Sequence, residues 1–450
     1  YPSSIITARS FWRFDKRWSR KRMSKWNTTN SRAGRLGIRF GNYLLPAEGV
    51  NPDTWAVIAC DQHTSNPGYW QDVEERVGDS PSTLRLVLPE VYLGSGTEEE
   101  RLAAIRDTMK RYRSGGLLQE VGPALIAVDR VTTHVSGRRG LLVLLDLEQY
   151  DYHPSSTLPA RATEETLEHR LPPRMAIRRE AAVEVSHVLV LLDDPADSVI
   201  GPVFAGLAGR SPDYRATLMK NGGTLSGYVL EDPAVAVEVV AALEKLAALG
   251  PERYHTEAPL LFAIGDGNHT LASAKKVWDE RKAELGPDHP LRYAMVELVN
   301  SHDPNLNVQP IHRVVWGITP AELRGELSQI ADVEVLENPK SGEGLAFRSK
   351  EGNAVILSRR LSPTEVGIRV QRRLEELETA KASVTVDYIH GETETTRIAG
   401  DKEGSAIIYP EIDPKIVFET VAHHEVLPRK FFSLGESEEK RYYFECRRLD

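Results

Sequence analysis

The segment Pro259–Leu285 constrains the fold more than any other stretch, because it reads as a buried strand, a glycine turn and a helix in direct succession. The apolar run Leu260–Ile264 has the length of a buried strand. The polar turn Gly265–Asn268 follows, and Leu271 and Ala274 then lie on one face of a predicted helix. This pattern predicts an α/β fold, in which ligands bind beyond the ends of strands.

The turn itself carries groups that can bind an anion. Gly265 and Gly267 allow the backbone to turn sharply and approach a ligand closely. The first turn of a helix attracts phosphate through its backbone N–H groups. Asp266 can hold Mg²⁺ or accept a proton from a reacting hydroxyl. Three side chains at the predicted helix start can donate hydrogen bonds, namely those of Asn268, His269 and Thr270. A purely structural strand–turn–helix unit is the alternative interpretation.

A second polar cluster follows another short apolar run. Trp55–Ala59 is predicted to be a buried strand, and Cys60–Ser65 comes directly after it. Within this cluster Asp61 and His63 are candidates for a general base, since histidine titrates near neutral pH. We expect the cluster to share one pocket with the glycine turn, because both follow strands that can be neighbours in a sheet. A loop that only caps the next element is the alternative.

Other residues are candidates for the same site. Glu164 is a second candidate for the base. The basic stretch Arg170–Arg179 and the pair His312–Arg313 are placed to meet an anionic ligand, or are ordinary surface groups. Near the C-terminal end, three residues are predicted to close over an anion: Arg429, Lys430 and Ser433.

Composition and charge narrow the class of protein. Hydrophobic residues make up 41% and charged residues 27% of the 450 residues, as in globular proteins. No apolar run approaches the ~20 residues that span a bilayer, so no membrane partner is expected. Cys60 and Cys446 are the only cysteines, so we expect no disulfide framework and a reducing cytoplasm.

The basic residues gather at the start of the chain. Residues 1–40 hold eleven Lys or Arg and one Asp, a contribution of +10 to the net charge of −9, so the remainder carries −19. This acidic body argues against nucleic-acid binding. We expect residues 1–38 to be a basic, disordered extension without a packed core, in which Met23 is an alternative start. An arm for nucleic acid or a membrane is the other interpretation.

The length of the chain and the changes in its sequence pattern predict several structural domains. We expect an α/β core over 39–316, a smaller α+β domain over 317–404, and a C-terminal segment over 405–450 that returns to the site. Within the core, Asp232 and Pro233 predict a helix start, and Gly250–Pro251 predicts its end.

Six stretches taken together resemble the bacterial and archaeal DUF1015 proteins. They are DYHPSSTLPARATEETLEHRLPPRMAIRREA, YRATLMKNGGTLSGYVLEDP, FAIGDGNHTLASAK, LNVQPIHRVVW, VDYIHG and LPRKFFSLGESEEKRYYFEC. The resemblance extends over nearly everything after about residue 38. Glu165 stands where the family pattern leads us to expect a glycine, which puts the shape of that turn in question.

The sequence Asp266–Ala272 is also similar to the signature of the ParB/sulfiredoxin-like superfamily, which includes free-serine kinases. This resemblance implies a nucleotide-binding core whose turn holds nucleotide phosphates. Members often have Arg where this chain has Thr270, so Lys430, Arg313 or Arg429 would have to supply the missing positive charge. Serine or phosphoserine is the substrate that the resemblance suggests.

We therefore expect a nucleotide-dependent phosphotransferase that acts on a small metabolite, with Mg²⁺ and ATP or ADP as cofactors. A phosphoserine phosphatase that uses the same groups is the first alternative. A nucleotide-responsive regulatory or DNA-binding module is the second, and a metal enzyme with convergent His63, His269 and His312 is the third. The oligomeric state stays open, with a homo-oligomer as one option.

Overall fold

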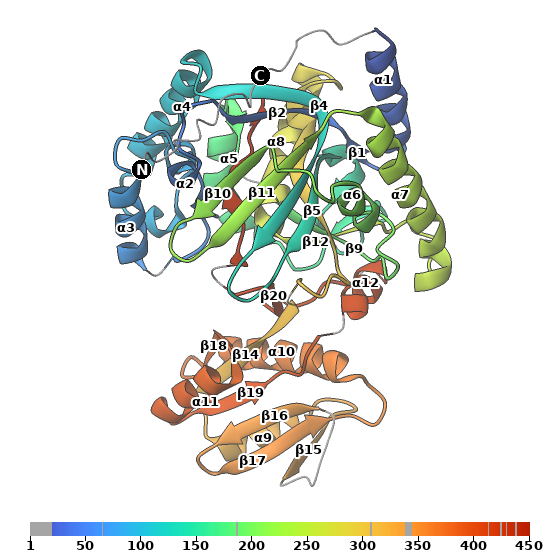
Figure 1. The fold of residues 1–450 in the computed structure, drawn as a ribbon. Coiled ribbons are helices and arrows are strands. Elements are labelled where there is room, and N and C mark those ends of the chain that lie inside the picture. Colours follow the sequence, from blue (N-terminus) through green and yellow to red (C-terminus); the bar gives the residue numbers. More distant parts are fainter. Residues whose placement is uncertain are drawn as a thin grey trace, which may run out of the picture.

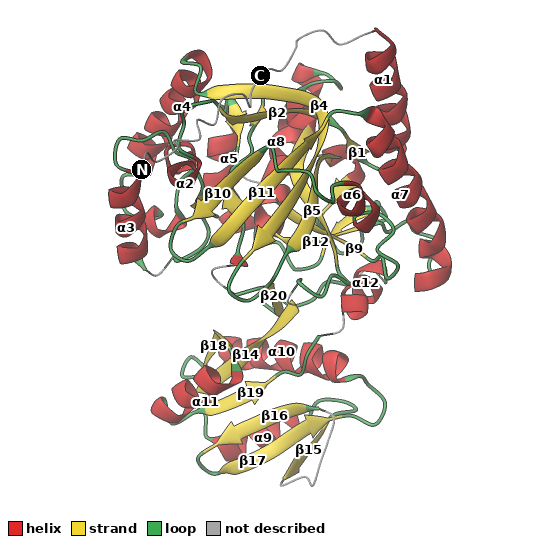
Figure 2. Cartoon of the chain, in the orientation of Figure 1, coloured by secondary structure: helices red, strands yellow, loops and turns green. Residues whose placement is uncertain are grey.

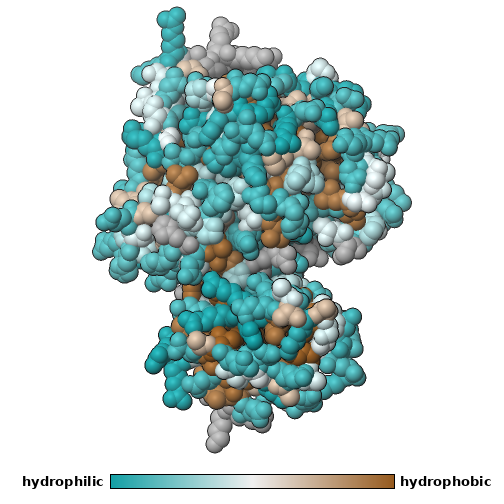
Figure 3. All heavy atoms as spheres, turned by 180° about the vertical axis from the view of Figure 1, so that it is seen from behind, coloured by the Kyte–Doolittle hydropathy of each residue, from teal (hydrophilic) through white to brown (hydrophobic). Residues whose placement is uncertain are grey.

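The computed structural model describes residues 20–450 apart from 65, 186–187, 307, 338–343, 413, 424, 429 and 437–438. The protein is a mixed α/β structure with a large sheet domain above a smaller one (Figures 1 and 2). On the face drawn in Figure 3 the surface is largely hydrophilic, and the molecule narrows between the two domains. The predicted fold class is thus confirmed as mixed α/β.

The large sheet has eleven strands and mixes parallel with antiparallel pairs. Its main path, in spatial order, is β10 (Tyr214–Leu218), β11 (Gly223–Leu230), β4 (Leu118–Val131), β5 (Arg138–Asp146), β13 (Tyr293–Asn300), β9 (Val188–Leu192), β12 (Phe262–Asp266), β7 (Ala160–Ala162) and β6 (Tyr150–Asp151). Two further strands pair at the side, β1 (Ile38–Arg39) with β5 and β2 (Gly41–Pro46) with β4.

Both faces of this sheet are buried because its central strands are apolar at consecutive positions. On β5, Leu141 and Val143 point into one core while Leu142 and Leu144 point into the other. Helices cover each face accordingly (Figure 2). The first core contains residues of α1 (Arg20–Arg35), α5 (Pro172–Arg179), α7 (Pro233–Tyr254) and α8 (Asn268–Leu285). The second contains residues of α2 (Pro52–Trp55), α3 (Pro67–Val77) and α4 (Glu98–Ser114).

The predicted strand–turn–helix unit is present as β12, a turn at Gly267 and α8. The strand begins two residues later than the sequence indicated and includes Gly265 and Asp266. Helix α8 buries the predicted face, including Leu271 and Ala274, against the large sheet. Strand β12 is parallel to β7 and antiparallel to β9, so it lies where the strand direction changes.

The smaller domain has a seven-stranded sheet with a core on each face. Its path is β15 (Glu334–Glu337), β17 (Gly352–Leu357), β16 (Leu345–Ser349), β19 (Ser405–Ile408), β14 (Val308–Trp316) and β18 (Thr385–His390), with β20 (Phe432–Leu434) on β14. Helices α9 (Pro320–Leu327) and α10 (Pro363–Ala380) pack on one face and α11 (Glu392–Asp401) on the other, whereas α12 (Pro414–Ala422) contacts α7 and β12 of the large domain.

The domain boundaries differ from the predicted ones. Strand β14 begins at Val308, so the smaller sheet starts before the expected boundary at residue 317. Strand β19, placed by sequence in the C-terminal segment, pairs with β14 and β16 of the smaller sheet. The segment that returns to the large domain begins with α12, where the Val421 carbonyl accepts from Arg161 at 3.1 Å, and continues at Leu427, whose N–H donates to the Thr163 carbonyl at 2.8 Å.

The expected disordered extension is wrong for Arg20–Arg35. These residues form α1, which lies beside α7 (Figure 1) and buries Trp26, Thr29 and Ala33. The charged face is neutralised by acidic residues of the body, as in the pair of Arg32 with Glu244 at 2.6 Å. Residues 1–19 lie outside the described part of the chain.

Two local expectations are also corrected. Helix α7 begins at the predicted cap, where the Asp232 side chain accepts from the Ala234 N–H, but it continues through Pro251 to Tyr254. Packing holds this last turn, since Tyr254 is buried and its hydroxyl donates to Asp193 at 2.5 Å. The predicted strand Trp55–Ala59 is shortened to β3 (Val57–Ile58), because Trp55 ends α2.

Within the described residues, no helix is both long and apolar enough to cross a bilayer. Cys60 and Cys446 are both free thiols, in agreement with the expectation that no disulfide framework exists.

Removing the Trp26 side chain is expected to destabilise the protein. Trp26 is 1% exposed, so Trp26→Ala leaves a cavity between α1 and the sheet and should lower the free energy of unfolding by about 3–5 kcal/mol. Chemical denaturation measures this loss. Met23→Ala, at an exposed position of the same helix, is the control and should change stability by less than ~0.5 kcal/mol. Equal stability of wild type and Trp26→Ala would contradict the packing of α1.

Candidate active site

A polar cavity of about 490 Å³ lies at the carboxyl end of β12, between the large sheet and the end of the smaller one. It brings together charged and hydrogen-bonding residues from segments that are far apart in the sequence. They are Asp61–Thr64, Glu90, Glu164, Arg170, Arg174, Gly265–Thr270, Tyr388, His390, Lys430, Ser433 and Lys440. The prediction that the Asp61–His63 cluster shares one pocket with Asp266–Thr270 agrees with this cavity.

The glycines of the turn are required by packing and by backbone conformation. At Gly267, φ is +88°, a value that favours glycine, and an added Cβ would lie 3.1 Å from Val188. At Gly265, an added Cβ would lie 2.7 Å from the Leu434 side chain of β20. The turn therefore fits tightly between β9 and β20, and this fixes where α8 begins.

The side chains at the start of α8 have distinct surroundings. Asn268 is buried and its amide donates to the carbonyl of Ile264 at 3.2 Å, which ties the helix start to its own strand. The Thr163 hydroxyl donates to the same carbonyl at 2.6 Å. His269 accepts at Nε2 from the Leu167 N–H at 3.2 Å. Of these side chains, those of Asn268 and His269 line the cavity together with Thr270.

The Asp61 loop reaches the cavity through a pairing with the C-terminal segment. Strand β3 pairs with β21 (Tyr442–Tyr443), not with a strand of the large sheet. Asp61 follows β3, and its carboxylate accepts from Gln62 at 3.1 Å. Burial, and then the negative charge of Asp266, raise the pKa of Asp61. His63 stacks on Tyr69 with ring centroids 3.7 Å apart.

Glu164 is an acidic group of the cavity whose pKa lies near neutrality. Burial raises its pKa to about 7, and repulsion from Asp266 acts in the same direction. Lys440, the backbone N–H of Lys430 and the Arg313 guanidinium oppose that rise. The neighbouring Glu165 is exposed and its φ is not positive, so the turn needs no glycine there.

Of the cations that line the cavity, sequence reasoning selected Arg170, Arg174 and Lys430 but not Lys440. The Lys440 ammonium lies 3.4 Å from the Asp266 carboxylate and its side chain is 12% exposed. Arg174 forms an ion pair with Glu90. Lys430, a predicted residue, lies 5.2 Å above the Tyr388 ring and lines the cavity as expected. Lys440 stands within the stretch LPRKFFSLGESEEKRYYFEC, but no local pattern marks it as a site residue.

Other residues that sequence reasoning missed form the side of the cavity next to the smaller domain. Tyr388 and His390 come from the end of β18, within the VDYIHG stretch. Burial lowers the pKa of His390, and the nearby Lys440 acts in the same direction. Ser433, which was predicted, also lines the cavity, and its hydroxyl donates to the Gly435 carbonyl at 3.0 Å.

The pair His312–Arg313 does not line the cavity, contrary to expectation. Arg313 is 0% exposed and donates to Gln371, and its guanidinium lies 4.8 Å from the Tyr409 ring centroid. His312 Nδ1 accepts from the Tyr409 N–H at 3.1 Å, and burial lowers the pKa of His312 to about 4. Both side chains make these contacts within the smaller domain, because β14 runs through its sheet. Arg429 lies outside the described residues.

The predicted convergence of three histidines is not formed. His63 and His269 line the cavity, but His312 does not. In the described part of the chain, no group of three or more His, Cys, Asp or Glu side chains is arranged to hold a metal ion. A divalent cation at Asp266 would therefore need ligands from a bound molecule as well.

The fold and the cavity define a mixed α/β protein with a charged cavity at the N-terminus of a helix. The chain belongs to the DUF1015 family, described as a protein of unknown function, whose model matches residues 44–380. No functionally curated protein is significantly similar to it in sequence.

Several solved structures are similar in fold at low identity. A conserved hypothetical protein from Pyrococcus furiosus is 14% identical with a TM-score of 0.35, covering 67% of this chain and 90% of that one. A free serine kinase in complex with AMP is 12% identical with a TM-score of 0.37, covering 71% and 94%. SbnI from Staphylococcus aureus, truncated at its C-terminus, is 11% identical with a TM-score of 0.35, covering 65% and 82%. These TM-scores lie below 0.5, so they carry no argument about function.

The raised pKa of Glu164 gives the free energy of unfolding a defined pH dependence. A carboxyl group whose pKa rises from 4.5 to about 7 on folding favours the folded state below pH 4.5. That contribution, up to ~3 kcal/mol, is lost as the pH rises from 4.5 through 7. Melting temperatures of Glu164→Gln should therefore fall less than those of wild type over this range. Glu165→Gln, at the exposed neighbour, should follow wild type; identical curves for Glu164→Gln and wild type would show that Glu164 does not titrate in this way.

Proposed function

We propose that the protein is a nucleotide-dependent phosphotransferase that acts on a hydroxyl group of a small metabolite. The observation that carries the proposal is the convergence of three carboxylates with lysine side chains at the start of a long helix. Asp61 and Glu164 follow two different strands and Asp266 ends a third, while Lys430 and Lys440 come from the returning C-terminal segment. Phosphoryl transfer depends mostly on positioning and charge neutralisation, which such a cavity supplies.

The N-terminus of α8 is the proposed phosphate site. The first N–H groups of any helix have no acceptor within the helix, and the helix dipole favours negative charge there. The side chains of His269 and Thr270 lie at this end, and Lys440 adds a positive charge beside Asp266. A phosphate bound there would accept from the free backbone N–H groups of the first turn of α8 and lie near the Lys440 ammonium.

Glu164 is the proposed general base. A base is most effective when its pKa lies near the working pH, and the pKa of Glu164 is about 7. Its carboxylate is positioned by the Lys430 backbone N–H. Asp61 and His63, which were the first candidates from the sequence, line the same cavity. We assign them to orient the hydroxyl substrate.

The cavity also fits a Mg²⁺–nucleotide complex, with ATP or ADP as the nucleotide. Mg²⁺ commonly uses one or two carboxylates together with substrate phosphates. The raised pKa values of Asp61 and Glu164 both include repulsion from Asp266, and a cation near Asp266 would relieve that repulsion. Asp266 and Asp61 would hold the ion, which when bound neutralises charge on the transferred phosphoryl group.

A nucleotide that binds the native protein is expected to raise its melting temperature. A ligand present at 100 times its Kd stabilises the folded state by ~2.7 kcal/mol. We expect this shift for ATP or ADP with Mg²⁺, and a smaller one after Mg²⁺ is removed with EDTA. Serine and phosphoserine are the first metabolites to test beside them. No shift with any nucleotide would contradict the proposal, and release of inorganic phosphate from phosphoserine without nucleotide would indicate a phosphatase instead.

Asp266→Asn is expected to distinguish a catalytic role of Asp266 from a purely structural one. The substitution keeps the size of the side chain but removes the charge that faces Lys440. Phosphoryl transfer should fall by at least ~10²-fold, because a positioned charged group is lost. The free energy of unfolding should change by less than ~1 kcal/mol, since the residue is half-buried at a strand end.

Asp288→Asn, at an exposed position after α8, is the matched control and should leave transfer unchanged. A folded Asp266→Asn protein with full activity would refute the role of Asp266 and leave the phosphate site at α8 to be judged by nucleotide binding.

A further inference from the structure

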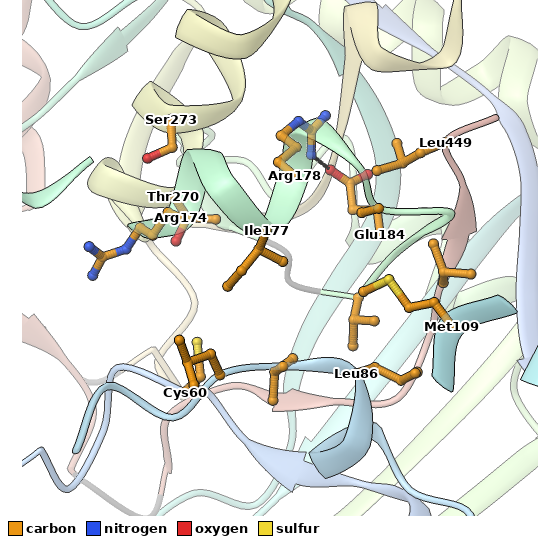
Figure 4. Close-up of a pocket in the computed structure, with 15 residues that line it drawn as sticks. Cys60, Leu86, Met109, Arg174, Ile177, Arg178, Glu184, Thr270, Ser273 and Leu449 are labelled. Atoms are coloured by element: carbon orange, nitrogen blue, oxygen red, sulfur yellow. Dashed lines mark hydrogen bonds and ion pairs between the residues drawn. The ribbon is translucent and has the colours of Figure 1, made fainter. Parts of the chain in front are cut away.

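A second, apolar cavity of about 80 Å³ adjoins the polar one. Its deep wall is made of side chains from α4, the segment before it and the C-terminal end, including Met109, Leu86 and Leu449. Figure 4 shows these three residues at one side of the cavity, with Arg174, Thr270 and Ser273 at the other. Ile177 of α5 lies between the two groups (Figure 4).

The two cavities share lining residues and therefore adjoin each other. Arg174 and Thr270 line both of them. Cys60, which lines the apolar cavity, directly precedes Asp61 of the polar one. A free cysteine side chain behaves as a small apolar group. A molecule whose phosphate lies at the N-terminus of α8 can reach the apolar cavity with an attached group.

The lining excludes a nucleobase as the occupant. The polar groups beside the deep part are Arg178 and Glu184, which form an ion pair (Figure 4), and Glu184 also pairs with Arg447 at 2.8 Å. Among the polar side-chain atoms of Arg178, Glu184 and Arg447, only the Arg178 Nε has no hydrogen-bond partner within the described residues. A buried base would leave most of its ring nitrogens and its amino group without partners, which costs free energy.

Its volume fits a small aliphatic group. An engineered apolar cavity of about 150 Å³ binds benzene, so 80 Å³ is of the order of three or four carbon atoms. We propose that this cavity is a specificity subsite for a short branched aliphatic group on the phosphoryl acceptor or its phosphorylated product. The inference rests on the proposed function for the phosphate end of the ligand. It narrows the substrate from small hydroxyl compounds in general to those that carry such a group, which serine lacks.

Two phosphate monoesters test the subsite. Isobutyl phosphate should bind at least about tenfold more tightly than methyl phosphate, because its three additional carbons leave water. The chain has five methionines, so ¹³C-methyl labelling gives a simple NMR spectrum. Isobutyl phosphate should shift the signal of Met109, while Met219, buried elsewhere in the same core, serves as the internal reference.

Substitution at the cavity wall provides the second arm. Ala181→Leu adds three carbons to a residue that lines the cavity, so it should abolish the preference for isobutyl phosphate and keep the binding of methyl phosphate. Ala176→Leu makes the same change on α5 at a position that does not line either cavity, and should keep the preference. If Ala181→Leu fails to fold, Ile177→Phe fills the cavity instead.

The outcomes separate the two proposals. Equal affinity for both esters with no shift at Met109 would overturn the subsite and leave the phosphate site standing. If neither ester binds but isobutanol shifts Met109, the phosphate site is wrong and the apolar cavity still accepts an aliphatic group. If neither the esters nor isobutanol have any effect, both proposals are overturned.

Discussion

The site depends on a buried ion pair that holds the C-terminal segment against the large sheet. Arg441 lies 3.0 Å from Glu297 of β13 and 2.8 Å from Glu445, and none of the three side chains is more than 3% exposed. Removing one partner of such a pair leaves an uncompensated charge in the interior, which is strongly destabilising. The adjacent residue is Lys440, so this anchor sets the distance between Lys440 and Asp266. The same anchor positions β21, on which β3 and the Asp61 loop depend.

Asp61, Glu164 and Asp266 lie together in the cavity, where burial and mutual repulsion cost free energy that the rest of the fold offsets. Asp61 and Glu164 each experience burial and the charge of Asp266, and both effects favour the protonated form. Lys440 lowers both pKa values, but burial and the charge of Asp266 outweigh its effect. Perturbed carboxyl groups that converge in one cavity are characteristic of functional sites, since a purely structural network would gain from pairing each charge fully.

The parts of the site that could be predicted from the sequence are those whose signal is local. The strand, the glycine turn and α8 follow one another directly, so their order alone indicates the site. The Asp61 cluster lies in the predicted pocket, but the reason given for that position was wrong. The strand before it, β3, pairs with β21 and not with a neighbour of β12. Lys440 and the burial of Arg313 depend on contacts between distant segments, which no local pattern reveals. The buried face of α1 could have been recognised in the sequence, because Trp26, Thr29 and Ala33 recur at helical spacing. The many charged residues around these positions obscured the pattern.

Strand β14 belongs to both halves of the molecule. Its first residues pair with β20 beside the polar cavity, and its later residues pair with β18 and β19 in the smaller sheet. The cavity is lined from both sides, by the β12 turn of the large domain and by Tyr388 and His390 of the smaller one. A molecule bound there would contact both domains, so its binding free energy would be lost when either one unfolds. Occupancy of the cavity would therefore join the two sheets into one cooperative unit, which would melt in a single calorimetric transition.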